Sequence, residues 1–196
     1  ERFRERHPDG RLTLHNAISA DGTDLLRSAD ADLPVGSMLD VPGDLSYAPT
    51  YRFEQVLITP LDHPLAGKSH INLEDLSPWP LILPPRRQVT WRLVDLVFQQ
   101  HRVPYTVALE VGGWEVIKQY VAMGMGISIV TALCLNDADR DKLAIRPMGD
   151  YFPHRSYGVT VRKGKYLSPQ PRAFIELIQP DLFAPRSYDD TGHSDR

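Results

Sequence analysis

Cysteine is almost absent from this 196-residue sequence, which has only Cys134. A single thiol cannot form a disulfide within the chain, so the fold must be held by other interactions, as is usual in a reducing compartment. Cys134 lies in the apolar run "ISIVTALCL". That context favours a small buried side chain over a catalytic thiol, which would need a histidine partner and an exposed position.

Long hydrophobic runs are also missing. No apolar stretch approaches the roughly 18 residues that a membrane-spanning helix needs. The first ten residues, "ERFRERHPDG", are charged and differ from a secretory signal peptide. These features predict a cytoplasmic protein, and the charged, helix-like start suggests a fragment of a longer one.

The chain lacks a surplus of positive charge. Its net charge is −3, whereas a domain that binds nucleic acid by itself is usually strongly basic. Hydrophobic residues make up 42% of the sequence, which is enough for a packed core. The composition therefore predicts a globular domain that does not bind duplex DNA on its own.

Catalytic and metal-binding patterns are missing as well. The 7 histidines show neither a pair on one helix face nor the spacing of a zinc site. The serines lack the G-x-S-x-G context of a nucleophile elbow, and "DADRDK" at 137–142 is a solvated charge run. We therefore expect no enzymatic activity, no bound metal and no cofactor.

Secondary structure follows from the hydrophobic periodicity. Helices are predicted at 90–101, 113–123 and 168–178. Strands are predicted at 11–18, 31–36, 51–60, 81–85, 105–111, 126–133, 143–148 and 157–163. Strands that alternate with helices predict an α/β fold with a mostly parallel sheet, in which ligands bind near helix N-termini.

Two helices show clear apolar faces. The first should bury Trp91, Val94, Val97 and Phe98, with Thr90 as its N-cap. The second should bury Val116, Ile117, Tyr120 and Val121 and end at Gly124.

Two turns join a strand to a helix N-terminus and are candidates for anion binding. The turn at Gly112-Gly113 brings free backbone N–H groups to the sheet edge, where the helix dipole favours negative charge. The turn "LPPRRQVTW" at 83–91 has the same arrangement. The residues expected to line a ligand site are Thr90, Gly112, Gly113, Trp114, Arg86, Gln88 and Ser19. The alternative is that both turns are ordinary packing with exposed loop arginines.

Three motifs in this order carry a resemblance to a known family: "DHPLAGK" at 62–68, "INLEDLSPWPLILPP" at 71–85 and "EVIKQYVAMGMGISIVT" at 115–131. Together they resemble the effector-binding domain of LysR-type transcriptional regulators, in particular the CysB group. The resemblance extends from about Pro8 to Phe183.

The resemblance implies two Rossmann-like lobes with a ligand cleft, as in type II periplasmic binding proteins. Residues 1–52 and 156–196 would form the first lobe, and 53–155 the second. The effector would be a small anion, such as a sulfate-like anion or an amino-acid derivative of sulfur metabolism. A winged helix-turn-helix that binds DNA would lie outside this chain, and the protein would form a homodimer, with a tetramer at full length.

Two other functions share parts of this pattern. A solute-binding protein of a transporter would have the same fold, but it would need an export signal. An α/β enzyme would need a converging acid, base or nucleophile, which the sequence does not show.

Overall fold

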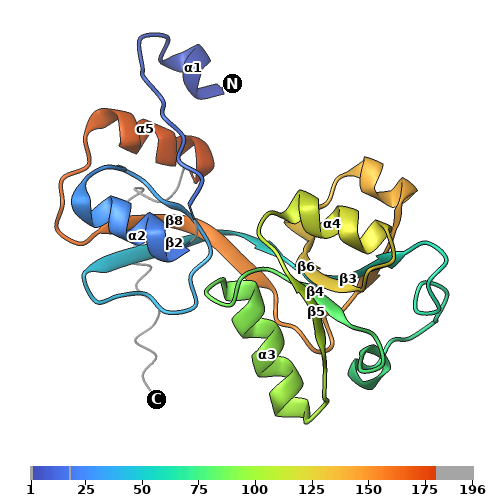
Figure 1. The fold of residues 1–196 in the computed structure, drawn as a ribbon. Helices are drawn as coiled ribbons and strands as arrows, with labels where there is room; N and C mark the ends of the chain where they lie inside the picture. Colours follow the sequence, from blue (N-terminus) through green and yellow to red (C-terminus); the bar gives the residue numbers. More distant parts are fainter. Residues whose placement is uncertain (1, 18, 180–196) are drawn as a thin grey trace, which may run out of the picture.

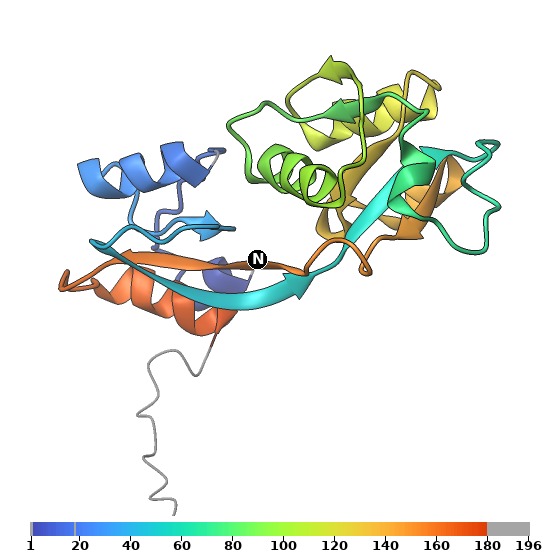
Figure 2. The ribbon, with the colours of Figure 1, turned by 90° about the horizontal axis from the view of Figure 1, so that it is seen from below.

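Two lobes joined by a pair of long strands make up the fold (Figure 1). The computed structural model describes residues 2–17 and 19–179, together with all of their side chains except those of Ser19 and Ala20. Both views show strands β2 and β8 running from one lobe to the other (Figure 2). The predicted two-lobed α/β architecture is therefore confirmed. The C-terminal part of the predicted first lobe, from 180 on, lies outside the described residues.

The connecting strands are antiparallel and paired along most of their length. β2 (Leu45–Phe53) pairs with β8 (Arg155–Arg162) from Leu45 opposite Arg162 to Phe53 opposite Arg155. Only Glu54 separates β2 from β3 (Gln55–Pro60), the first strand of the second lobe. The chain therefore crosses between the lobes at 53–55 and returns at 155, and the lobe boundaries placed at these points remain a prediction.

The first lobe, lobe I, is a small sheet between helices. Its strands lie in the order β1-β8-β2, all antiparallel, with β1 covering only Val35–Gly36. Its helices are α1 (Arg2–Arg6), α2 (Ser19–Ser28) and α5 (Pro169–Ile178). The buried ring of Phe3 meets Phe174 edge-on at 5.5 Å, which fixes α1 against α5.

The strand predicted at 11–18 is wrong for the described part, residues 11–17, which form no strand. Leu14, expected on an apolar strand face, is 81% exposed. A strand needs a neighbouring edge for its backbone hydrogen bonds, and no other described strand lies against this segment.

The second lobe, lobe II, has a mixed sheet covered on both faces. β3 lies between β6 (Ser128–Thr131) and β7 (Leu143–Pro147), antiparallel to both. β4 (Leu81–Leu83) runs parallel to β5 (Val107–Glu110), and an isolated parallel bridge links Leu81 to Ile127, the residue before β6. The expectation of a mostly parallel sheet is wrong, because most strand pairs are antiparallel: in lobe II β3 runs against its neighbours β6 and β7, and in lobe I β8 runs against β1 and β2.

Helices cover the two faces of this sheet. α3 (Val89–His101) packs its buried Trp91, Val94, Val97 and Phe98 into one core cluster with Leu57, as predicted. α4 (Trp114–Ala122) packs on the other cluster, which contains Val56 and Ile58. Successive residues of β3 thus serve opposite cores, which accounts for its uninterrupted apolar sequence. Short 3-10 helices complete the lobe at Leu73–Leu76, Ala132–Cys134 and Asp137–Asp141.

The predicted inner face of α4 is partly wrong. Ile117 and Val121 are buried and Tyr120 packs against their cluster, but Val116 is 37% exposed. Lys118 is buried instead, because Asp139 and Glu115 neutralise its charge. Gly124 follows the helix with a positive φ of 76°, in agreement with its predicted role at the C-terminal end.

None of the helices in residues 2–17 and 19–179 is both long enough and apolar enough to cross a lipid bilayer.

Candidate functional site

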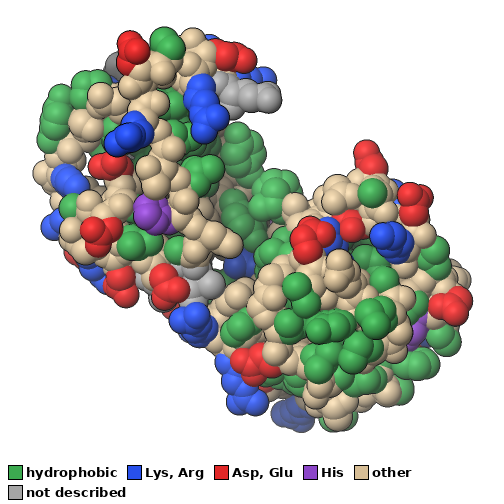
Figure 3. All heavy atoms as spheres, turned by 45° about the horizontal axis from the view of Figure 1, so that its top comes forward, with side chains coloured by type: hydrophobic (Ala, Val, Ile, Leu, Met, Phe, Trp, Pro, Cys, Tyr) green, Lys and Arg blue, Asp and Glu red, His purple; other side chains and the backbone are tan. Residues whose placement is uncertain are grey.

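The junction of the lobes brings together polar side chains from four elements. Arg155 begins β8, and Ser37 follows β1 in lobe I. Thr90 lies in the first turn of α3, and Thr131 ends β6 in lobe II. With Tyr157 of β8, these residues make up what we call the interlobe site. Figure 3 shows the two lobes as separate rounded bodies with a notch between them.

Arg155 is the centre of the interlobe site. Its Nε donates a hydrogen bond to Ser37 Oγ at 3.0 Å. Its Nη1 donates to Thr90 Oγ1 at 2.5 Å and contacts Thr131 Oγ1 at 3.5 Å. The guanidinium also lies over the Tyr157 ring, 5.3 Å from the ring centre. One cation therefore links both lobes through neutral oxygen atoms.

Among the described residues, the charge of Arg155 has no acidic partner. Burial lowers the pKa of Arg155, although its ordinary pKa is so high that it stays protonated. No carboxylate forms an ion pair with it in the part of the chain that is described. A partly buried cation without a counter-charge is unfavourable, so the interlobe site favours an anion.

The hydroxyl of Thr131 has a second partner besides Arg155, the side-chain amide of Gln55. Gln55, at the start of β3, donates from Nε2 to Thr131 Oγ1 at 3.1 Å. Both residues are fully buried where the chain enters lobe II. The pairing orients the hydroxyl on the lobe II side of the site.

Thr90 is a site residue for a different reason than predicted. The N-cap of α3 is Gln88, which has extended backbone angles, and Thr90 lies two residues further on. The predicted N-cap is therefore wrong. Thr90 is 1% exposed and its hydroxyl is turned to Arg155, so its position at the lobe junction is explained by that contact.

Arg86 lies at the same turn but is already neutralised. Its backbone N–H donates to Glu110 Oε1 at 3.1 Å, and its Nε lies 3.7 Å from Glu110 Oε2. Its guanidinium lies over Trp91 at 5.1 Å, and the side chain is largely exposed. Gln88 is half-buried in the same turn. Arg86 thus forms a surface ion pair with Glu110 and is not an unpaired cation.

The turn at Gly112-Gly113 is open to solvent. Gly113 is the N-cap of α4 and has a positive φ of 89°, which favours glycine there. Trp114 packs against the α4 core cluster. No recorded hydrogen bond or ion pair of the described residues joins this turn to Arg155, so its share in a common site remains a prediction. Ser19 begins α2, but its side chain lies outside the description.

Two surface ion pairs also bridge the lobes. Arg87 lies 3.8 Å from Asp21 of α2, and Arg92 lies 4.0 Å from Asp40. All four side chains are at least half exposed, and such pairs contribute at most about 1 kcal/mol. The interlobe site and the two connecting strands are therefore the stronger links between the lobes.

The described residues provide neither a metal site nor a reactive thiol near this junction. Across 2–17 and 19–179, no three His, Cys, Asp or Glu side chains gather as a metal site would require. Burial raises the pKa of the Cys134 thiol to about 11, so this thiol is protonated at neutral pH and a poor nucleophile.

Sequence reasoning missed Arg155, Ser37 and Thr131. Arg155 lies in "FPHRSYGV", which has no motif or periodicity that singles out an arginine. The turn that carries Thr90 was predicted, and among the predicted residues whose side chains the structure describes, Thr90 is the one that hydrogen-bonds to Arg155.

The two-lobed fold is that of the ligand-binding domains of the LysR class. Residues 1–182 match the LysR substrate binding domain, and the chain belongs to that family. It is 25% identical over 182 residues to the transcriptional regulator CysB of Burkholderia cenocepacia, covering 92% of this chain and 58% of that protein. It is 29% identical to the regulator Cbl of Escherichia coli, covering 92% of this chain and 57% of Cbl.

Solved structures show the same fold. The cofactor-binding domain of the Cbl transcriptional regulator superposes with a TM-score of 0.84 and 26% identity, covering 92% of this chain and 80% of that chain. The regulatory domain of CcmR from Synechocystis, in complex with 2-PG, superposes with a TM-score of 0.84 and 28% identity, covering 93% and 88%. The chain spans 57–59% of the length of the curated relatives CysB, Cbl and SsuR.

Proposed function

We propose that this domain binds a small anion at the interlobe site and that binding changes the angle between its lobes. The observation that carries the proposal is Arg155, a cation between the lobes that has hydroxyl partners and no carboxylate among the described residues. A bound anion would supply the missing counter-charge. Its affinity would come from a charge-assisted hydrogen bond.

The hydroxyl groups around Arg155 suit an oxyanion. Thr90 accepts a hydrogen bond from Arg155 through its oxygen and keeps its own hydrogen to donate to a ligand. The named relatives CysB and Cbl are transcriptional regulators, and the CcmR regulatory domain is complexed with 2-PG. We propose a sulfate-like anion or an anionic amino-acid derivative of sulfur metabolism as the effector.

Anion binding would act on both lobes at once. Ser37 belongs to lobe I, Thr90 and Thr131 belong to lobe II, and Arg155 bonds across them. A ligand that replaces these direct contacts has different affinities for open and closed arrangements, and it therefore shifts their populations. In a longer protein with a DNA-binding domain and a homodimeric or tetrameric assembly, this shift would change the spacing of the DNA-binding domains.

Arg155→Met tests the proposal. We expect the affinity for an anion that binds the unmodified chain to fall at least about 30-fold, because a charged partner of the ligand is lost. Thr90→Val should weaken the same ligand by about 1–3 kcal/mol. Isothermal titration calorimetry with sulfate, O-acetylserine and 2-PG would measure both effects.

Arg86→Met is the matched control for this experiment. It removes an arginine that is exposed and already paired with Glu110, so the affinity should change less than about 3-fold. Circular dichroism would establish that each variant is folded. Equal affinities in the unmodified chain and in Arg155→Met would place the anion elsewhere and contradict the proposal.

A further inference from the structure

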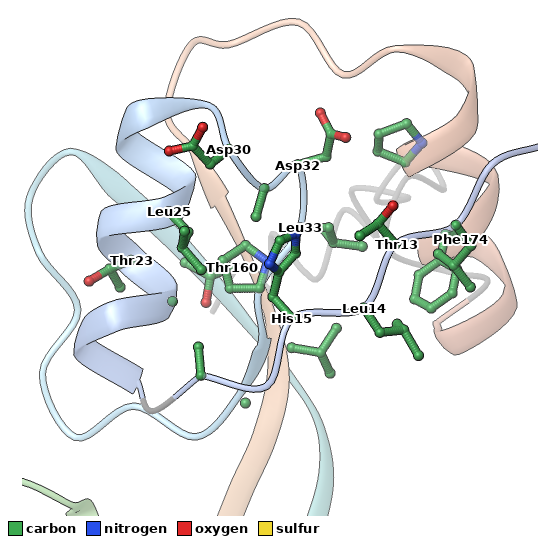
Figure 4. Close-up of a pocket in the computed structure, with 18 of the residues that line it drawn as sticks. Thr13, Leu14, His15, Thr23, Leu25, Asp30, Asp32, Leu33, Thr160 and Phe174 are labelled. Carbon is green, nitrogen blue, oxygen red and sulfur yellow. The ribbon is translucent and has the colours of Figure 1, made fainter.

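Two cavities differ in the polar groups that border them. One, of about 640 Å³, lies in lobe I between residues 11–17, α2 and α5, and Figure 4 shows Leu14 and Phe174 among the side chains around it. The other, of about 290 Å³, lies in lobe II and is lined by His63 and Trp79. Among the described side chains, His63 Nε2 is the one buried nitrogen or oxygen atom without a hydrogen-bond partner. The lobe II cavity therefore lies beside a buried polar group whose role the anion site does not explain.

This cavity lies at the end of lobe II that is remote from the interlobe site. Strand β3 starts at the lobe junction with Gln55 and ends at Pro60, which lines the cavity. Ile127, also in the cavity wall, precedes β6, whose other end is Thr131 of the interlobe site. A function of His63 would thus be separate from the binding of an anion between the lobes.

His63 holds the turn that follows β3. Its Nδ1 accepts a hydrogen bond from the backbone N–H of Leu65 at 3.2 Å, as in turns that a side chain closes over the residue two positions on. Leu65 is 4% exposed and belongs to the core cluster that α3 also joins. The carbonyl oxygens of Leu65 and Ala66 accept hydrogen bonds from Arg146 of β7 at 3.5 and 2.7 Å. The imidazole therefore fixes a turn that contributes an apolar side chain to the core.

The protonation of His63 follows from these contacts. Because Nδ1 accepts a hydrogen bond, the hydrogen of the neutral ring is on Nε2. That N–H is buried, and the ring packs against Trp79 with the ring centres 4.2 Å apart. A second proton would have to bind to Nδ1, where it would meet the N–H of Leu65 and break the hydrogen bond. The protonated ring is therefore incompatible with the closed turn.

Few charges surround His63. Asp62, in the same turn, is the other titratable residue of the cavity wall, and the rest of the wall consists of proline, glycine, tryptophan and isoleucine residues. Arg146 contacts the turn through carbonyl oxygens, and Lys68 in the same loop is paired with Asp75. Burial lowers the pKa of His63 below its ordinary 6.5, and the negative charge of Asp62 offsets only part of this effect. Packing and hydrogen bonding thus both favour the neutral ring.

We propose that His63 is a pH switch, in which protonation of the imidazole opens the turn at residues 62–67 and releases Leu65 from the lobe II core. A histidine whose pKa is lower in the folded state binds protons more weakly when folded. Its stabilising contribution is complete above about pH 6.5 and is lost as the pH falls through the folded-state pKa. Ordinary carboxylates titrate near pH 4, so a change in mildly acidic solution reports on a histidine.

Hydrogen–deuterium exchange of the Leu65 amide in the 196-residue chain tests the proposal. After correction for the intrinsic exchange rate, its protection should fall at least about 3-fold between pH 7.5 and pH 5. His63→Asn should abolish this fall, because the asparagine oxygen can accept the same N–H in an Asx-turn and does not titrate. His63→Phe keeps an aromatic ring beside Trp79 but has no acceptor, so its protection should be low at both pH values.

His70→Asn is the matched control. It removes an exposed histidine from the same loop and should leave the fall in protection unchanged. An NMR titration of His63 in the unmodified chain needs no variant, and it should give a pKa below 6.5. A pKa of 6.5 or above, or equal Leu65 protection at both pH values in the unmodified chain, would overturn the proposal. So would a fall that persists in His63→Asn, or full protection in His63→Phe.

Discussion

Replacing Gly158 by alanine is expected to lower the free energy of unfolding by about 3 kcal/mol or more. Gly158 lies in β8, opposite Pro49 of β2. A Cβ at this position would lie 2.0 Å from the Ala48 carbonyl oxygen and 2.7 Å from Pro49 Cα. Both are backbone atoms that cannot rotate away, so the two strands that join the lobes would have to separate. Urea unfolding followed by circular dichroism would measure the loss.

Gly36→Ala is the matched control. Gly36 is the partner of Gly158 across the β1–β8 pair, and no atom lies within 4 Å of a Cβ added there. Its free energy of unfolding should change by less than about 1 kcal/mol. If the two variants unfold at the same urea concentration, the close approach of β2 to Gly158 is not what requires glycine in this strand.

Lys118→Met should lower the free energy of unfolding by about 3–5 kcal/mol, because it removes one member of a buried ion pair. The Lys118 side chain is 4% exposed. Its Nζ donates to Asp139 Oδ2 at 2.8 Å and to the Cys134 carbonyl oxygen at 3.1 Å, and it pairs with Glu115 Oε1 at 2.7 Å. These contacts tie α4 to the segment that follows β6. Chemical denaturation at neutral pH would measure the effect.

Two further variants distinguish the ion pair from a general effect of losing a lysine. Lys165→Met removes an exposed lysine and should change the free energy of unfolding by less than about 0.5 kcal/mol. Adding Asp139→Leu to Lys118→Met removes the carboxylate that is left without its partner, so most of the stability should return. A double variant that is less stable than Lys118→Met would contradict this account.

The same ion pair makes the difference in free energy of unfolding between the unmodified chain and Lys118→Met depend on pH. Burial raises the pKa of Asp139, but hydrogen bonds from Lys118 and from the Asn136 backbone N–H outweigh it, so the pKa lies below its ordinary 3.8. A lowered carboxyl pKa stabilises the folded state above the unfolded pKa, and this contribution is lost as pH falls through the folded pKa. The difference between the unmodified chain and Lys118→Met should therefore be constant near neutrality and shrink below about pH 4.

Local patterns predicted the helices well and some of the strands poorly. The spacing of Trp91, Val94 and Phe98 places them on one face of any α-helix, whatever that helix packs against, and all three are buried. A strand is different, because its hydrogen bonds come from residues far away in the sequence. The apolar alternation at 11–17 is of the strand type, yet no described strand lies beside it. On α4, the burial of Lys118 depends on Asp139, 21 positions away, which helical periodicity cannot anticipate.

The sequence by itself determined the α/β class, the buried face of α3, the family and the turn that holds Thr90, because these depend on neighbouring residues or on an ordered set of motifs. Only the tertiary structure decided that Arg155 is the centre of the interlobe site. Its contacts Thr131, Thr90 and Ser37 lie 24, 65 and 118 positions away in the sequence. They meet because β2 and β8 cross between the lobes and bring both chain passages to one junction. Contacts between such distant residues are set by how the sheets pack, and no local pattern in the sequence records them.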